Sequence, residues 1–173
     1  TVRDDLQSEI KRGSEVSIAA ACFSMYAYKE LKKQLDSIDE LRFIFTSPTF
    51  VAEKASKQKR EFYIPRLARE KSLYGTEFEI KLRNEMTQRA IAKECADWIR
   101  RKVTFKSNTT GENMGGFMTV DSGASQIAYM PINGFTTVDI GCERGNNRYN
   151  MVNCFDAPFA QQYMQLFDQL WND

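Results

Sequence analysis

The first chemical constraint on this chain is that its 173 residues include no histidine. Histidine is the commonest general acid–base side chain and the usual partner that activates a cysteine or serine nucleophile. The chain has four cysteines, and none of them forms a C-x-x-C pair. A cysteine–histidine catalytic pair and a mixed cysteine–histidine zinc site are therefore excluded, and we expect no metal and no cofactor. The expected buried, reduced thiols are Cys22, Cys95, Cys142 and Cys154.

Nucleotide chemistry also lacks its usual motif. No G-x-x-x-x-G-K-[ST] phosphate loop is present, so an ATP-dependent motor would lie outside this chain. The pair Gly115-Gly116 could form an anion-binding turn, but a lone glycine pair is far more often a turn that enters a strand.

A cluster of basic residues lies between positions 54 and 71. It has seven cations against Glu61 and Glu70, on a chain whose formal net charge is only +1. Phe62 and Tyr63 lie among them, which suits contact with phosphates and stacking on bases. A solvated face with its aromatic side chains in the core would explain the same residues, and the two arginines of the segment GCERGNNRYN are equally typical of an exposed turn. The candidate nucleic-acid-binding residues are Lys54, Lys57, Lys59, Arg60, Arg66, Arg69, Lys71, Arg144 and Arg148.

The elements that must position these residues begin with a βαβ unit. Residues 16–23 (VSIAAACF) are nearly all apolar and carry no charge, which is typical of a strand covered on both faces in a parallel sheet. Residues 26–35 are expected to form a helix and residues 41–46 (LRFIFT) a second strand. The two strands should be adjacent, central and parallel.

Helices and short strands account for the rest of the chain. We expect helices over residues 2–12 and 79–102, the second with an apolar stripe that includes Leu82, Met86, Trp98 and Ile99. Short apolar or alternating runs predict strands at 103–105, 116–120, 126–130, 135–140 and 149–155. A last helix should follow Asp156 as its N-cap, with proline in its first turn.

This layout resembles the phospholipase D-like domains found at the N-termini of bacterial helicase-like proteins of superfamily 2. The resemblance rests on the order of elements and on the strings VSIAAACF, LKKQL, LRFIFT-SPT and FDQLW. It implies an α/β fold, namely a phospholipase D-like mixed β-sheet flanked by helices on both faces. It also implies that residues 1–173 form a single domain and a fragment of a longer, ATP-binding helicase-type protein.

The catalytic signature of that family, H-x-K-x-x-x-x-D followed by G-S-x-x-N, is degenerate here. In the family a histidine attacks phosphorus, while lysine and asparagine stabilise the phosphoryl oxygens. The best match, residues 114–121, keeps only the aspartate, and the nearest asparagine is one residue late. The remnants are Met114, Gly116, Asp121 and Asn133. We therefore expect this domain to be catalytically inactive.

The resemblance and the basic cluster together favour a non-catalytic accessory domain that binds or positions DNA. The basic segment should then lie beside a groove where Asp121 and Asn133 converge. The alternative is a structural module that self-associates or docks a partner, because single-motif phospholipase D-like domains usually pair as homodimers across a two-fold axis. The longest apolar run is too short for a bilayer and no export leader precedes Thr1, so we expect a cytoplasmic protein without a membrane.

Overall fold

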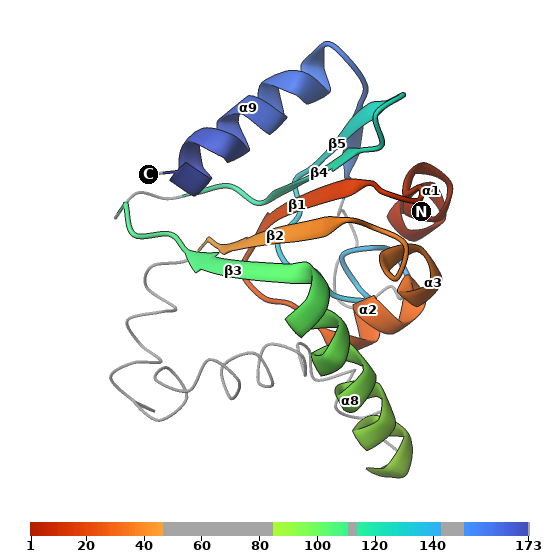
Figure 1. The fold of residues 1–173 in the computed structure, drawn as a ribbon. Coiled ribbons are helices and arrows are strands. Elements are labelled where there is room, and N and C mark those ends of the chain that lie inside the picture. The colour runs from red at the N-terminus through yellow and green to blue at the C-terminus, as the bar shows by residue number, and fades with distance from the viewer. Residues whose placement is uncertain (47–84, 111–113, 143–150, 173) are drawn as a thin grey trace.

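A computed structural model describes residues 1–46, 85–110, 114–142 and 151–172, with only the backbone described at residues 85–88. These residues form a six-stranded mixed sheet in the order β3-β2-β1-β4-β5-β6, with helices on both faces (Figure 1). The strands are β1 (Glu15–Ala20), β2 (Glu40–Phe45), β3 (Val103–Ser107), β4 (Phe117–Asp121), β5 (Gln126–Met130) and β6 (Asn153–Phe155). The helices are α1 (Val2–Glu9), α2 (Met25–Glu30), α3 (Lys32–Leu35), α8 (Glu85–Lys102) and α9 (Phe159–Asn172).

The expected parallel pair is confirmed at the centre of the sheet. β1 and β2 run parallel with Ile18 opposite Phe43. β3 extends the parallel pairing beyond β2, whereas β4 pairs antiparallel with β1, and β5 and β6 continue that antiparallel half. The sheet is therefore mixed: β1, β2 and β3 form its parallel half, and β4, β5 and β6 form its antiparallel half.

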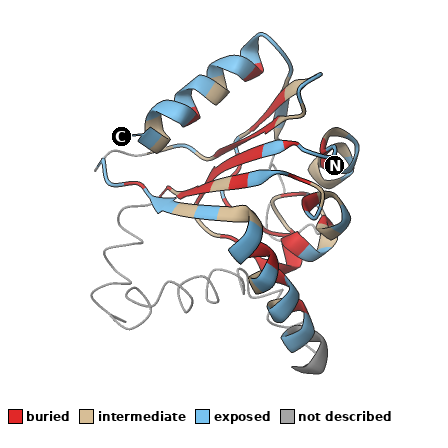
Figure 2. Cartoon of the chain, viewed as in Figure 1, coloured by how far each residue is buried: buried red, intermediate tan, exposed pale blue. Residues whose placement is uncertain are grey.

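The two faces of the sheet differ in how they are covered. The larger core packs α1, α2, α3 and α8 against one face (Figures 1 and 2). Trp98 and Ile99 of α8 are buried there, as the helical stripe predicts, whereas Leu82 and the side chain of Met86 lie outside the described residues. On the opposite face α9 packs through Phe167 on Ala19, Ile44 and Phe117.

The expected strand at residues 135–140 is wrong. Only Phe135 makes a bridge, to Phe23, and a single helical turn follows it. Thr136 and Asp139 cause this turn, because the Thr136 hydroxyl accepts a hydrogen bond from the Asp139 backbone N–H and donates one to its carboxylate. A threonine three residues before an acid is a sequence signal for the start of a helix, and here it prevails over the apolar alternation.

Three helices also differ from their expected bounds. α1 ends at Glu9, whereas the sequence predicts a helix over residues 2–12. The helix expected over residues 26–35 is split into α2 and α3 at Leu31, whose φ and ψ of −116° and 13° are not helical. α9 begins at Phe159, so Pro158 lies in the turn before the helix rather than in its first helical turn. Among the described residues, no helix combines the length and the apolar character that crossing a membrane requires.

The four cysteines all fall within the described residues, and none forms a disulfide. Cys95 is buried as expected, and burial raises the pKa of its thiol. Cys22 and Cys142 are only half-buried and Cys154 is exposed on β6, so the expectation of four buried thiols is wrong for these three. The Cys154 Sγ lies 3.6 Å from a carboxylate oxygen of Asp5, and desolvation together with that carboxylate raises the pKa of Cys154 to about 11. A thiol held protonated in this way is a poor nucleophile.

Candidate functional site

Three of the four signature remnants lie at one end of the sheet. Met114 and Gly116 precede β4, next to the carboxyl end of β1, and Asn133 follows β5 at the same end. The Asn133 carbonyl accepts a hydrogen bond of 2.8 Å from the backbone N–H of Ala21, the residue after β1. The carboxyl ends of the parallel strands are where open α/β sheets bind their ligands.

Asp121 lies at the other end of the sheet, so the expected convergence of Asp121 and Asn133 is wrong. Asp121 ends β4 opposite Glu15, the first residue of β1. Since strands rise about 3.3 Å per residue, the six steps of β1 from Glu15 to Ala21 separate the two positions by about 20 Å. Asp121 instead accepts hydrogen bonds from Gly123 and Gln126 and stabilises the turn between β4 and β5.

The backbone leaves no space for a side chain at Gly116, the residue that the expected resemblance aligns with the signature's lysine. A Cβ atom at this position would lie 1.7 Å from the carbonyl oxygen of Ile132 and 3.0 Å from that of Ala19. The Gly116 carbonyl also accepts a hydrogen bond of 3.0 Å from the Ile132 N–H. Two backbone segments therefore meet at the point where the family's phosphate-binding lysine would stand.

Met114, which the expected resemblance aligns with the nucleophilic histidine, has a structural environment. Its side chain is half-buried against the apolar cluster of Ala19, Ile44, Phe117 and Phe167. A thioether fills such irregular apolar gaps well. This position therefore supports the packing of α9 on the sheet and offers no group for proton transfer.

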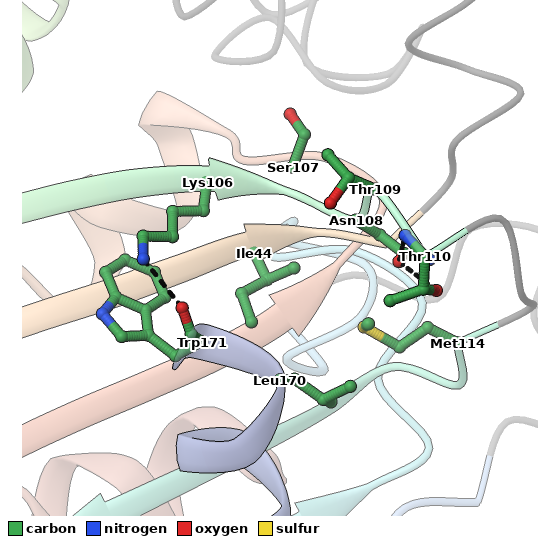
Figure 3. Close-up of a pocket in the computed structure, with 9 residues that line it drawn as sticks. All are labelled: Ile44, Lys106, Ser107, Asn108, Thr109, Thr110, Met114, Leu170 and Trp171. Atoms are coloured by element: carbon green, nitrogen blue, oxygen red, sulfur yellow. Dashed lines mark hydrogen bonds between the residues drawn. The ribbon is translucent and has the colours of Figure 1, made fainter. Parts of the chain in front are cut away.

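A small cavity opens beside Met114, between the ends of β2 and β3 and the C-terminal turn of α9 (Figure 3). Its volume of about 30 Å³ holds one or two water molecules, far less than a nucleotide needs. Its polar lining consists of an ammonium group, hydroxyls and an amide, which suit hydrogen bonding rather than proton transfer. The lining residues are Ile44, Lys106, Ser107, Asn108, Thr109, Thr110, Met114, Leu170 and Trp171.

Two cations beside this cavity bind α9 to the sheet. The Lys106 Nζ donates a hydrogen bond of 2.7 Å to the Trp171 carbonyl and lies 4.5 Å from the centre of its ring. Such a cation also stabilises the negative end of a helix dipole. Arg42 donates a 2.8 Å hydrogen bond to Asp168 and lies 4.9 Å from the centre of the Phe167 ring. The sequence interpretation missed both residues, although each is a lone cation in a strand, the usual sign of a specific partner on the same face.

Other polar side chains near this end of the sheet also have structural partners. Asp139 accepts hydrogen bonds from the Thr136 hydroxyl and the Gly134 N–H, yet burial raises the pKa of its carboxyl above the ordinary value. A side chain on Gly134 would collide with Cys22, since a Cβ there would lie 2.7 Å from the thiol sulfur. Within the described ranges, no group of three or more cysteine, aspartate or glutamate residues could hold a metal ion.

The nucleic-acid-binding prediction concerns a different part of the chain. Its seven residues between positions 54 and 71, together with Arg144 and Arg148, lie outside the described residues, so that prediction stays a prediction. Among known proteins, no family model, curated protein or solved structure matches the chain.

Proposed function

We propose that this chain is a non-catalytic phospholipase D-like accessory domain of a DNA-acting, helicase-type protein, in which it binds or positions nucleic acid. The observation that carries the non-catalytic part is the contact between the backbones of Gly116 and Ile132, which excludes a lysine side chain from the signature position. The absence of histidine removes the nucleophile and the general acid independently.

The binding part rests on charge. Residues 54–71 concentrate five excess positive charges, with Phe62 and Tyr63 between them, on an otherwise near-neutral chain. Local clusters of cations attract the phosphate backbone, and aromatic side chains stack on unpaired bases. Such a surface gives weak, salt-sensitive and non-specific affinity, which suits a domain that positions a substrate for a motor elsewhere in the parent protein.

Salt-dependent binding tests this proposal. Fluorescence anisotropy should show that the chain binds a short labelled DNA at low salt, with an affinity that falls steeply as salt rises. Reversal of Lys57, Lys59 and Arg60 to glutamate should weaken binding and reduce the salt slope by about one unit for each cation that no longer pairs with a phosphate.

The matched control reverses three exposed cations elsewhere, Lys11→Glu, Arg12→Glu and Lys33→Glu, which changes the net charge equally. Equal binding by the two triple variants would remove residues 57–60 from the proposal, and no salt-sensitive binding by the wild type would refute it. The same preparation should not hydrolyse a phosphodiester. Metal-independent cleavage that co-purifies with the folded chain would contradict the non-catalytic part.

A further inference from the structure

Positive charge is unevenly distributed over the described chain. Residues 89–110, which include most of α8 and all of β3, carry six cations and two carboxylates. Residues 1–46 carry seven cations and eight carboxylates. Residues 114–142 and 151–172, which include β4, β5, β6 and α9, carry four carboxylates and neither lysine nor arginine. Among the described side chains, cations are therefore in excess only over residues 89–110.

The sheet separates these charges in space. β3 and β6 form its opposite edges, and α8 leads directly into β3. Figure 1 shows α8 extending away from the β3 side of the sheet, whereas α9 packs on the other face. A polyanion is therefore attracted to the side of α8 and β3 and repelled by the carboxylates of the half that contains β4, β5 and β6.

Three exposed cations of α8 form a line along the helix. Lys93 follows Arg89 by four residues, and Arg100 follows Arg89 by eleven, which is about three turns of an α-helix. Cys95 and Trp98 are buried on the opposite side of α8, so the line faces away from the core (Figure 2). At a rise of about 1.5 Å per residue, the line spans about 16 Å. We call Arg89, Lys93 and Arg100 the α8 stripe.

We propose that the α8 stripe contacts the phosphates of a DNA duplex that runs along α8, in addition to the cations between positions 54 and 71. This inference rests on the proposed function, because it adds a second set of contacts to the same ligand. A span of about 16 Å matches about five successive steps of one strand, at about 3.4 Å a step. Trp98 is the only aromatic residue of α8 and is buried, so the stripe fits the phosphate backbone rather than the faces of the bases.

Asp97 limits the affinity of this surface. Its carboxylate is paired with the Arg100 guanidinium, and the two side chains are 52% and 57% exposed. An ion pair that is so exposed contributes little to folding, so a phosphate can replace Asp97 as the partner of Arg100. A guanidinium binds phosphate through two parallel hydrogen bonds, whereas the Asp97 carboxylate repels phosphate. Removal of this carboxylate should therefore strengthen binding.

An anionic membrane is a poorer fit to the same cations. Helices that lie on a membrane insert an apolar side between their charged residues. The exposed large hydrophobic residues of the described chain are Met151, Phe159 and Leu166, and all three lie in the half that has no cations. The α8 stripe therefore fits a nucleic acid better than a lipid surface.

Fluorescence anisotropy of the full chain with a labelled duplex of about 20 base pairs tests the proposal. The double variant Lys93→Gln/Arg100→Gln should bind about tenfold more weakly at about 50 mM salt, and its salt slope should fall by about two units. The control Gln161→Glu/Gln165→Glu changes the net charge equally at exposed positions of α9 and should bind as the wild type does. Both double variants should unfold at the temperature of the wild type, because all four positions are exposed.

A gain of affinity provides a second test that misfolding cannot imitate. Asp97→Asn should bind the duplex about twofold more tightly or better, whereas Asp156→Asn, the same charge change at an exposed position between β6 and α9, should have no effect. Equal affinities for these two variants would overturn the inference, as would equal affinities for the two double variants. Salt-sensitive binding by the wild type would in either case still support the proposed function. A wild type without such binding would overturn both.

Discussion

The close approach of backbone at Gly116 can be tested sharply, because the neighbouring Gly115 provides a matched control. A Cβ at Gly116 would meet backbone oxygen at 1.7 Å, whereas a Cβ at Gly115 would meet nothing within 4 Å. Neither residue has a positive φ, so alanine is free of backbone strain at both positions. The variants Gly116→Ala and Gly115→Ala therefore differ only in what the added methyl group contacts.

The expected cost follows from those contacts. The Ile132 carbonyl cannot rotate away from the added methyl group as a side chain could, so the chain segments at Gly116 and Ile132 must move apart. Overpacking of this kind costs about 1–3 kcal/mol. Separation also weakens the 3.0 Å hydrogen bond between the Ile132 N–H and the Gly116 carbonyl, which contributes about 1 kcal/mol. Replacing glycine by alanine also restricts the unfolded chain, which stabilises the folded state by about 0.4–1 kcal/mol. This gain is the same in both variants and cancels in the difference between them. Gly116→Ala should thus be less stable than Gly115→Ala by about 2–4 kcal/mol.

Urea denaturation of the two variants and the wild type measures this difference directly. For a chain of this length it corresponds to a melting temperature lower by about 5–15 °C. Gly115→Ala should unfold within about 0.5 kcal/mol of the wild type or slightly above it. Equal unfolding midpoints for the two alanine variants would refute the close approach at Gly116, and with it the steric argument against a lysine there.

Two further predictions concern the core and the turn at residues 136–139. Trp98 is fully buried and its Nε1 donates a hydrogen bond of 2.8 Å to the Leu35 carbonyl. Trp98→Ala should therefore lower the free energy of unfolding in urea by about 3–5 kcal/mol. A loss below about 1 kcal/mol would contradict the packing of α8. Burial raises the pKa of the Asp139 carboxyl above its ordinary 3.8, so the folded chain favours the protonated form of this side chain. The protonated carboxyl therefore contributes fully to the stability of the fold at low pH. This contribution is lost as pH rises through the pKa of Asp139 in the folded chain. The stability of the wild type relative to Asp139→Asn should therefore fall as pH rises above the ordinary carboxyl pKa of about 4, and a difference that rises with pH would show that the hydrogen bonds outweigh burial.

The sequence predicts the central elements well because their signals are local. The uncharged, largely apolar run after Glu15 in β1 and the second apolar strand that follows α3 are typical of a buried parallel pair, and the register confirms it. The bounds of β5, residues 126–130, agree with the prediction because turn residues flank an apolar core on both sides. The turn at 136–139 was predictable too, from Thr136 and Asp139, but the apolar residues around it favoured a strand.

The geometry of the signature site depends on pairing, which local signals do not describe. Asp121 and Asn133 are close in sequence, and the family resemblance places them in one groove. The β4–β5 hairpin separates them, since Phe117 and Met130 lie at one end of the sheet while Asp121 and Gln126 lie at the turn. A chain that reverses after Asp121 returns Asn133 to the end where Met114 and Gly116 lie. From the sequence alone, a prediction that residues 117–130 form a hairpin would have placed Asp121 at the end of the sheet opposite Asn133.

The fold also changes how the absence of the signature lysine, at position 116, is interpreted. In the sequence, glycine at position 116 reads as a deleted side chain that one substitution would restore. In the structure that glycine is required by Ile132, sixteen residues later, whose carbonyl occupies the space that the side chain would need. Backbone atoms therefore fill the space beside position 116. The thioether of the nearby Met114 packs beneath α9. Replacing side chains alone therefore cannot make room for a lysine at position 116 unless the backbone segments at Gly116 and Ile132 also move apart.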